Sequence, residues 1–251
     1  MMTSFSPAWS SAPDHPQLAA REIHVWGSAL DRDLTCLAKF KTLLSKSEQE
    51  RASRFRFDRD AIRFVASRAM LRLILSRYLD IDPSDLEFSY GPNGKPALQV
   101  QGNDLRFSLS HSDGLLLCAV SRDVDLGLDI EKIRQPIDAD PIAKRTFSPS
   151  VSARIQSLSG LAKVEAFYSS WVLHEAFVKA IGVGLANAQI EASPNVIEKL
   201  SQSYEFQYFL PDPLIDHEAI DCYQFMIGED YVSAVVALME DRSLTHFWWI
   251  D

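Results

Sequence analysis

Residues 105–130, LRFSLSHSDGLLLCAVSRDVDLGLDI, carry the clearest fold signal in this 251-residue chain. Apolar and polar side chains alternate over residues 105–110 and again over 124–130, and an apolar run covers 115–121. Alternation with a period of two is typical of half-buried strands, and a short apolar run is typical of a buried strand. The pattern therefore predicts three consecutive strands in an antiparallel meander.

Helical and strand-like segments lie on both sides of this stretch. Residues 60–78 and 162–181 are expected to form long helices, the second ending at Gly182 and Gly184. Ser47 followed by Glu50 matches a capping box, which predicts a helix start after an early strand at residues 23–25. Strand-like patterns return at residues 204–210, 222–227, 231–239 and 245–250, whereas Pro136 and Pro141 indicate a loop.

The order of strand, long helix and further strands thus occurs once in each half of the chain. This order predicts an α+β protein with two similar lobes related by a pseudo-twofold axis, each a long helix packed on a small, mainly antiparallel sheet. The lobes are expected at residues 1–126 and 127–251. No clear sequence repeat relates them.

The composition excludes several classes of protein. With 47% hydrophobic and 24% charged residues, the chain is neither disordered nor fibrous. Its three cysteines are widely spaced without a CxxC pair, which disfavours a disulfide framework or a zinc site. The apolar runs are shorter than the roughly 20 residues that span a bilayer, and residues 1–20 do not read as a secretory signal. A cytoplasmic monomer is expected.

Charge is distributed unevenly along the chain. The net charge of -9 lies entirely in the second half, because residues 1–126 hold 16 basic and 16 acidic side chains, whereas residues 127–251 hold 9 and 18. Within the first half, residues 39–77 carry eleven basic and four acidic side chains. A basic segment beside an acidic half indicates a phosphate-bearing ligand, with a metal ion on the acidic side. A solvated helix face is the alternative interpretation.

Three acidic side chains and a lysine are candidates for a metal and phosphate site. Asp129 and Glu131 lie two apart in a predicted strand, so both project from one face, although such pairs also occur on exposed edge strands. Trp171, Glu175 and Lys179 follow at successive i, i+4 steps on one helix face, a spacing that an ordinary ion pair also has. If Glu175 faces the strand pair, the three carboxylates suit Mg²⁺, and Lys179 would contact a phosphate.

A second candidate group lies in the first half of the chain. Ser110 and His111 close a predicted strand at a turn where an anion can bind, and Lys95 lies on a turn after Gly94. Ser110 and His111 are a poor nucleophile and base pair, because adjacent strand residues point to opposite faces and no G-x-S-x-G elbow is present.

Four motifs in this order resemble one family. They are Gly94-Lys-Pro96, Phe107-Ser-Leu-Ser-His-Ser112, Gly127-Leu-Asp-Ile-Glu131 and Trp171-Val-Leu-His-Glu-Ala-Phe-Val-Lys179. The series closely resembles the 4'-phosphopantetheinyl transferases. The length of the chain and its second helical segment favour the two-lobed, monomeric Sfp-type branch of that superfamily.

The resemblance implies a reaction and a place for it. The family transfers the 4'-phosphopantetheine moiety from coenzyme A to a serine of an apo acyl or peptidyl carrier protein, giving holo carrier protein and 3',5'-ADP. Such carriers serve fatty acid, polyketide and nonribosomal peptide biosynthesis. The active site is expected in the cleft between the two lobes.

The resemblance also implies roles for individual residues. The Mg²⁺ ligands would be Asp129, Glu131 and Glu175. The residues implied to bind coenzyme A are Lys95 and Pro96 along the nucleotide, Ser110 and His111 at its phosphates, Lys179 at the pyrophosphate, and Arg51 and Arg63 at the 3'-phosphate. The catalytic residues would be Glu175, Lys179 and His111, and whether Glu175 is a general base or only a metal ligand stays open.

The chain departs from the family pattern at two places. His174 stands where the family usually has lysine, and residues 147–152 lack a glutamate that the family often has there. Because histidine changes its charge near neutral pH, we expect reduced or more pH-dependent turnover. The alternatives are a non-catalytic paralogue that binds coenzyme A or carrier protein, and a Mg²⁺-dependent pyrophosphatase or phosphodiesterase. Nucleic-acid binding fits poorly, because the basic run is short.

Overall fold

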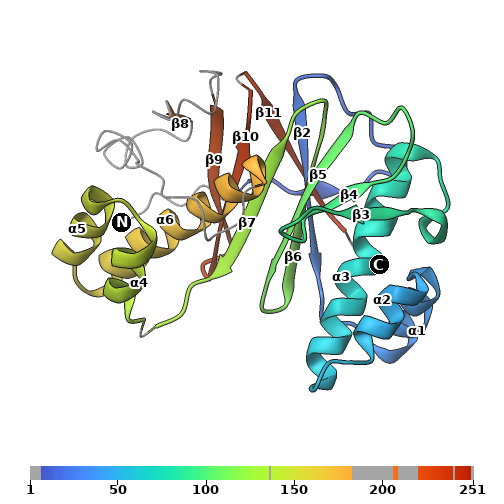
Figure 1. Ribbon diagram of the computed structural model, residues 1–251, viewed down its shortest axis with the longest axis horizontal. Helices are drawn as coiled ribbons and strands as arrows, with labels where there is room; N and C mark the ends of the chain where they lie inside the picture. The colour runs from blue at the N-terminus through green and yellow to red at the C-terminus, as the bar shows by residue number, and fades with distance from the viewer. Residues whose placement is uncertain (1–6, 136, 183–205, 209–219, 240, 250–251) are drawn as a thin grey trace. The chain divides into compact units, whose positions relative to one another are not determined.

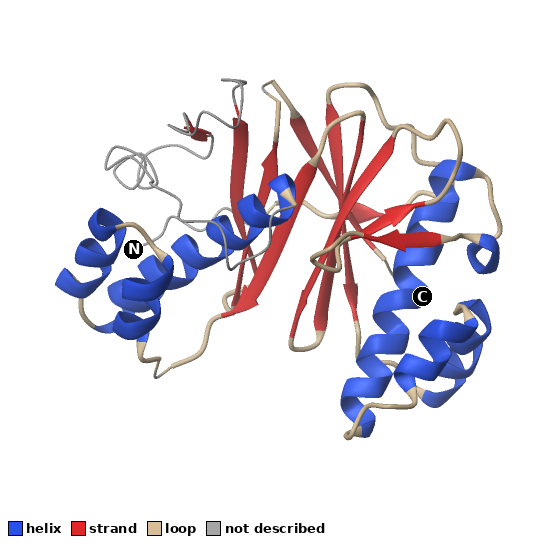
Figure 2. Cartoon of the chain, viewed as in Figure 1, coloured by secondary structure: helices blue, strands red, loops and turns tan. Residues whose placement is uncertain are grey.

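The chain folds into two compact units, each built of helices and antiparallel strands. A computed structural model describes residues 7–135, 137–182, 206–208, 220–239 and 241–249. One unit comprises residues 9–123 and 244–249, and the other comprises the described part of residues 124–243. Figure 1 gives the order of the elements, and Figure 2 separates helices from strands in the same view. The predicted α+β class is confirmed.

The first unit contains a five-stranded sheet in the order β1-β11-β2-β6-β5. Its strands are β1 (Ser10–Ser11), β2 (Glu22–Ala29), β5 (Leu105–Ser112), β6 (Leu115–Arg122) and β11 (Ser243–Trp248). Strand β6 pairs antiparallel with both β2 and β5. The sheet therefore takes one strand from the far end of the chain, so this unit is not a continuous N-terminal segment.

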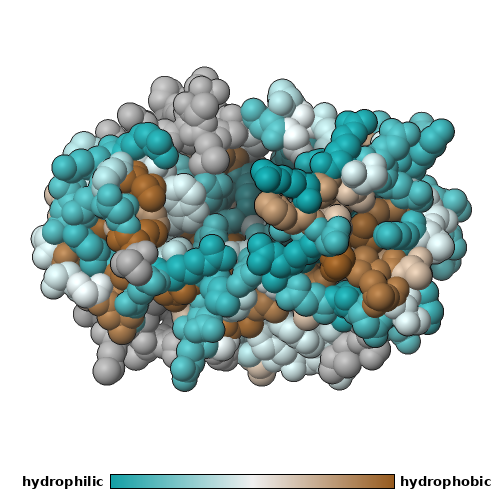
Figure 3. Space-filling model, turned by 90° about the horizontal axis from the view of Figure 1, so that it is seen from below, coloured by the Kyte–Doolittle hydropathy of each residue, from teal (hydrophilic) through white to brown (hydrophobic). Residues whose placement is uncertain are grey.

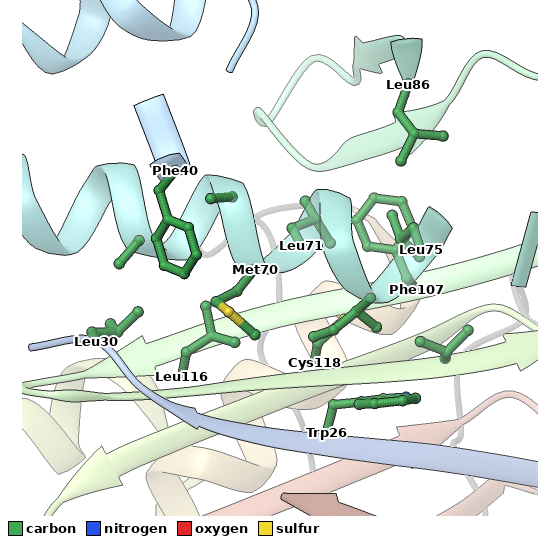
Figure 4. Packing of buried hydrophobic residues seen from close by; sticks show 14 of the residues in the cluster. Trp26, Leu30, Phe40, Met70, Leu71, Leu75, Leu86, Phe107, Leu116 and Cys118 are labelled. Carbon is green, nitrogen blue, oxygen red and sulfur yellow. The ribbon is translucent and has the colours of Figure 1, made fainter. Parts of the chain in front are cut away.

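Helices and a hairpin complete the first unit. They are α1 (Leu34–Leu43), α2 (Lys46–Ala52), α3 (Asp58–Leu79), the short 3-10 helix η1 (Pro83–Asp85), and the antiparallel strands β3 (Phe88–Tyr90) and β4 (Pro96–Leu98). The 22-residue helix α3 corresponds to the long helix that the periodicity predicts at 60–78. Figure 4 shows its side chains Met70, Leu71 and Leu75 near Leu116 and Cys118 of the sheet. Burial of this apolar layer holds α3 to the sheet.

The second unit contains a four-stranded antiparallel sheet in the order β7-β10-β9-β8. Its strands are β7 (Leu126–Lys132), β8 (Phe206–Tyr208), β9 (Ile220–Ile227) and β10 (Tyr231–Ala237), and its helices are α4 (Ala139–Thr146), α5 (Pro149–Ser157) and α6 (Gly160–Ile181). Helix α6 ends as predicted at Gly182, whose φ of 74° is a left-handed conformation that favours glycine. Gly184 and the outer parts of the predicted strand 204–210 lie outside the described residues.

Gly127 lets helix α6 approach strand β7 at backbone distance. A Cβ atom at this position would lie 1.7 Å from the carbonyl oxygen of Ala176 and 2.5 Å from the amide nitrogen of Ala180. Both of these atoms belong to helix backbone, which no side-chain rotation can move aside. The glycine of the sequence Gly127-Leu-Asp-Ile-Glu131 therefore brings the acidic end of β7 close to α6.

Three expectations for the secondary structure are wrong. Strands β5 and β6 pair as predicted, but β7 joins β10 in the other sheet instead of extending a meander. The capping box uses Ser45 and Glu48 rather than Ser47 and Glu50, because Ser45 caps α2 while the Glu48 side chain accepts a hydrogen bond from the Ser45 amide. Pro141, expected with Pro136 to mark a loop, lies in helix α4, and helix α5 was not expected.

All three cysteines are free thiols, and Cys118 and Cys222 are buried, whereas Cys36 is only half-buried. Within the described part of the chain, no helix has the length and apolar character needed to cross a membrane.

Candidate active site

Helix α6 sets a lysine against a buried aspartate of β7. Lys179 donates from Nζ to Asp129 Oδ1 at 2.6 Å and to the carbonyl oxygen of Leu128 at 3.1 Å. Asp129 is only 4% exposed, so this ion pair is shielded from solvent on the aspartate side. A charge-assisted hydrogen bond at this distance is among the stronger polar contacts in proteins. It fixes the register of α6 against the acidic strand.

Asp129 and Glu131 project from the sheet face that α6 covers. In the β7–β10 ladder they lie opposite Ala234 and Val232, and those two residues pack in the apolar cluster with α6. Directly opposed residues in an antiparallel pair share one face of the sheet. The prediction that both carboxylates leave the same face is therefore confirmed.

Glu175 lies in the negative field of these two carboxylates. Its Oε1 atom is buried and accepts no hydrogen bond from the described residues. Burial and the charges of Asp129 and Glu131 together raise its pKa from 4.5 to about 7, although Lys179 opposes the shift. One lysine thus does not compensate three carboxylates. Perturbation by burial and specific neighbouring charges is characteristic of functional sites.

The three carboxylates form a donor set that fits a hard divalent cation. They supply only oxygen atoms, the ligand type that Mg²⁺ prefers, and one of those atoms is a buried acceptor. Among the described residues, however, no group of three or more His, Cys, Asp or Glu side chains is arranged so that it could hold a metal ion. That Asp129, Glu131 and Glu175 converge on one cation therefore stays a prediction, and Asp129 is instead bound by Lys179.

His174 is buried beside an aromatic ring. It is 4% exposed, and its ring stands edge-on to Phe147 at 5.9 Å between centroids. Burial lowers its pKa, which favours the neutral imidazole. The expected reduction or pH dependence of turnover stays a prediction. Consecutive residues of a helix point about 100° apart, and this rotation turns His174 into the aromatic cluster of α6.

Arg63, predicted to bind the 3'-phosphate, lies in the first unit between two carboxylates. Its Nε and Nη2 atoms donate to Asp31 at 2.8 and 3.0 Å, and Nη1 donates to Asp113 at 2.8 Å. These bonds tie α3 to the turn that follows β5. Burial opposes its charge, but the bonds to Asp31 and Asp113 raise the pKa of the guanidinium further above its already high value. Sequence reasoning missed both aspartates, although Asp113 directly follows the Ser-His-Ser motif.

Arg51 lies close to the same part of the first unit. Its guanidinium stands over the ring of Phe64, 5.1 Å from the centroid, and Phe64 follows Arg63 in the chain. Arg51 is exposed at the last turn of α2, so its position depends on how α2 is held against α3. The structure thus brings the two predicted phosphate contacts to the same end of α3.

Lys95 and Pro96 lie on the hairpin formed by β3 and β4. The predicted turn is present: the amide of Gly94 donates to the carbonyl of Gly91 at 2.9 Å, and the amide of Gly91 donates to the carbonyl of Lys95 at 3.0 Å. Gly94 has a φ of 80°, which a residue with a side chain rarely adopts. The turn therefore fixes the position of Lys95 relative to strands β3 and β4.

Ser110 and His111 leave β5 on opposite faces. Ser110 is 8% exposed and pairs with Leu117, whereas His111 is exposed and pairs with Leu116. The two side chains therefore approach any ligand from different sides of the sheet. This arrangement confirms that they are not a nucleophile and base pair.

A separate cavity of about 640 Å³ lies in the first unit among α1, α2 and α3. Its walls are mostly apolar and include Leu34, Phe55 and Ile62, but none of the predicted site residues. Leu34 is 81% exposed and Phe57, next to this cavity in the chain, is 59% exposed. Figure 3 shows hydrophobic atoms at the surface on the side of this unit. This cavity is distinct from the charged groups described above.

Comparison with known proteins relates most of the chain to one group of enzymes. Residues 33–122 match a family described as 4'-phosphopantetheinyl transferase, N-terminal, and residues 125–236 match the 4'-phosphopantetheinyl transferase superfamily. The second match contains Asp129, Glu131, Glu175 and Lys179, and the first contains the remaining predicted site residues.

Individual relatives agree with the family matches. The chain is 37% identical to the 4'-phosphopantetheinyl transferase HetI of Nostoc sp. over 183 residues, which are 72% of this chain and 77% of the relative. It is 32% identical to the 4'-phosphopantetheinyl transferase Sfp of Bacillus subtilis over 219 residues, 86% of this chain and 93% of the relative. The chain is therefore an enzyme of the 4'-phosphopantetheinyl transferase superfamily.

Proposed function

We propose that this enzyme takes 4'-phosphopantetheine from coenzyme A and attaches it to a serine of an apo acyl or peptidyl carrier protein, releasing 3',5'-ADP. The observation that carries this proposal is the group of Asp129, Glu131 and Glu175 beside Lys179, where negative charge exceeds positive charge in a partly buried place. Such a place suits a cation that bridges the protein and a pyrophosphate. The proposal includes a cytoplasmic monomer, and free thiols agree with a reducing compartment.

The cation in this proposal is Mg²⁺, held by Asp129, Glu131 and Glu175. Bound there, it would neutralise charge on the pyrophosphate of coenzyme A and on the departing phosphate. The buried Oε1 atom of Glu175, which accepts no hydrogen bond from the described residues, supports its role as a ligand. Asp129 remains paired with Lys179, so the lysine orients the aspartate as well as adding positive charge.

In the proposed reaction the serine oxygen of the carrier attacks the β-phosphorus of coenzyme A. A new phosphorus–oxygen bond forms, and the bond from the β-phosphorus to the bridging oxygen breaks, so that 3',5'-ADP departs with the electron pair. The serine proton must pass to a base. Glu175 is the candidate in the described site, but a carboxylate committed to a metal ion is a poor base. Lys179 stabilises the negative charge that develops on the leaving phosphate.

The nucleotide end of coenzyme A is assigned to residues of the first unit. Arg51 and Arg63 would contact the 3'-phosphate, Lys95 and Pro96 would lie along the nucleotide, and Ser110 and His111 would contact phosphate oxygens. Arg63 already holds two carboxylates, so a phosphate must share or replace one of them. That the residues of both units serve one coenzyme A molecule is part of the proposal.

Intact mass spectrometry tests this function. Apo acyl and peptidyl carrier proteins are incubated with the enzyme, coenzyme A and Mg²⁺, beside the variants Glu175→Gln and Glu165→Gln. Glu165 lies on the same helix away from the acidic group, so its variant is a matched control. We expect the wild type and Glu165→Gln to add one phosphopantetheine per carrier and Glu175→Gln to lose at least about 100-fold in rate.

Two outcomes would contradict the proposal. Transfer by Glu175→Gln at the wild-type rate would remove the acidic group from the reaction. Wild-type binding of coenzyme A without transfer to any carrier would favour a paralogue that does not catalyse the reaction on these carriers.

A further inference from the structure

The hairpin that carries Lys95 and Pro96 cannot hold its own position. Strands β3 and β4 have three residues each and form a separate two-stranded sheet. An isolated two-stranded hairpin is at best marginally stable in water. The place of Lys95 therefore depends on contacts between the hairpin and the helices beneath it.

Phe88 and Leu98 of the hairpin pack against the apolar core, and the polar contacts of the hairpin strands to α3 come from one arginine. Arg68 donates from Nη2 to the hydroxyl of Tyr90 at 3.0 Å, and its guanidinium lies 5.0 Å from the ring centroid of Phe88. Tyr90 is the last residue of β3 and stands opposite Pro96 in the hairpin ladder. The hydroxyl of Tyr90 thus fixes the strand end from which the turn to Lys95 begins.

Arg68 is itself held in place by a buried glutamate. Its Nε atom donates to Glu48 Oε1 at 2.6 Å, and the other oxygen of Glu48 accepts from Arg72 Nε at 2.9 Å. Arg68 is 7% exposed, Arg72 is 2% exposed, and Glu48 is 4% exposed. Arg72 also donates to the carbonyl of Leu86 just before the hairpin. Side chains locked by such paired charges have little freedom to move.

The same glutamate belongs to the helix that carries Arg51. Glu48 lies in α2, three residues before Arg51 and one turn from it. One buried network thus joins α2, the middle of α3 and the hairpin, and these elements carry Arg51, Arg63 and Lys95. The network consists of hydrogen bonds between elements distant in sequence.

We propose that Arg68 and Tyr90 are positioning residues for coenzyme A, which hold the Lys95 hairpin at a fixed place relative to the arginines of α2 and α3. This inference rests on the proposed function of the site. Tyr90 is 51% exposed, so removal of its hydroxyl leaves the core packing intact. The bond to a guanidinium is a charge-assisted one, whose loss weakens the position of the hairpin rather than its fold.

The test compares two hydroxyl deletions in the same hairpin. Tyr90→Phe removes the bond to Arg68, whereas Ser89→Ala removes a hydroxyl that faces the carbonyl of Ala97 within the hairpin. For Tyr90→Phe we expect KM for coenzyme A to rise roughly three- to tenfold, with kcat and the unfolding temperature nearly unchanged. Ser89→Ala should leave all three quantities at the wild-type values.

A double-mutant cycle shows whether Tyr90 acts through Lys95. If it does, Tyr90→Phe should raise KM much less in a Lys95→Ala background than in the wild type. Additive effects of the two substitutions would overturn the inference, and so would an equal KM increase in Ser89→Ala. A fall in kcat and unfolding temperature at constant KM would assign Tyr90 a structural role instead.

Coenzyme A affinity separates this inference from the proposed function. Calorimetric titration of each variant with coenzyme A measures the positioning effect without any carrier protein. If the wild type binds coenzyme A but transfers nothing, weaker binding by Tyr90→Phe would still support the inference while the proposed function fails. If the wild type binds no coenzyme A, both are overturned.

Discussion

Two glutamates with buried carboxylate oxygens, the buried Glu48 of α2 and the half-buried Glu175 of α6, have opposite electrostatic surroundings. For Glu48 burial alone would raise the pKa, but Arg68, the Ser45 amide and Arg72 outweigh it and lower the pKa. For Glu175 burial and the charges of Asp129 and Glu131 raise the pKa to about 7 against the opposing charge of a single lysine. The first carboxylate is satisfied within the protein, and the second is not.

This difference agrees with a structural role for Glu48 and with the proposed cation-binding role of Glu175. A buried charge that is fully paired holds elements together, as Glu48 does for α2 and α3. A carboxylate that stays unsatisfied costs stability and is retained where a ligand completes it. Part of the positive excess of residues 39–77 is therefore neutralised within the protein, because Arg63, Arg68 and Arg72 form ion pairs with its carboxylates.

Removal of the paired carboxylate should have the largest effect. Glu48→Gln leaves Arg68 and Arg72 buried without a counter-charge, which we expect to lower the free energy of unfolding by about 3–5 kcal/mol. Urea denaturation at pH 7 measures this, with Glu50→Gln at an exposed neighbouring position as control. Because the pKa of Glu48 is lowered, its stabilisation is present above pH 4.5 and is lost as pH falls, so the difference should shrink in acid. A loss under about 1 kcal/mol would contradict the claim that Glu48 stabilises the fold by pairing with Arg68 and Arg72.

The acidic group depends on the close approach of α6 to β7, which a single methyl group should disrupt. Gly127→Ala puts a Cβ atom on the Ala176 carbonyl, and we expect a loss of roughly 3 kcal/mol together with most of the transfer activity. Gly91→Ala is the matched control, because a Cβ there lies 3.7 Å from its nearest neighbour. Wild-type stability in Gly127→Ala would show that α6 does not need this glycine.

Neutralising the carboxylate of Glu175 should change the free energy of unfolding in the opposite direction. With its pKa raised from 4.5 to about 7, Glu175 favours the folded state below pH 4.5, and this contribution is lost as pH rises through 7. In metal-free buffer at pH 8, Glu175→Gln should therefore stabilise the protein by about 1–2 kcal/mol, a value reduced for partial exposure. Urea titrations at pH 5 and pH 8 check this, and destabilisation at pH 8 would contradict it.

An exposed ion pair should contribute almost nothing to the free energy of unfolding. Arg59 and Asp60 are separated by 3.6 Å, with side chains 71% and 41% exposed. Arg59→Ala is expected to change the free energy of unfolding by less than about 0.5 kcal/mol. A change above 1 kcal/mol in the same urea experiment would mean that exposure does not decide the effect of a charge here.

Local patterns predicted the two long helices and most of the strands. Alternation and helical periodicity located α3, α6 and β5 to β7, because each element buries one regular face. They did not show that β7 belongs to the second sheet rather than to the sheet of β5 and β6. The reason for Gly127 in β7 becomes visible only in the structure, where its Cα lies against the backbone of Ala176. They also could not choose between the capping boxes at Ser45 and Ser47. That choice follows from Glu48, whose arginine partners lie 20 and 24 residues further along the chain.

The candidate site was predictable in its acidic part and less so in its basic part. Strand spacing predicted the shared face of Asp129 and Glu131, and helical spacing placed Glu175 and Lys179 on one helix face, but the packing of that helix face on the strand could not be derived from spacing. The partners of Arg63 are different, because Asp31 and Asp113 come from loops that only the tertiary fold brings together. The burial of His174 was likewise invisible, as it depends on packing against Phe147 from another segment.

The dependence of the transfer rate on Mg²⁺ tests the central claim most directly. Initial rates with coenzyme A and an apo carrier protein are measured over a range of Mg²⁺ concentrations for the wild type, Glu175→Gln and Glu165→Gln. The account predicts that Glu175→Gln needs at least about tenfold more Mg²⁺ for half-maximal rate, while Glu165→Gln matches the wild type. An unchanged Mg²⁺ requirement in Glu175→Gln, whatever its maximal rate, would contradict the claim that the unsatisfied carboxylate holds the cation.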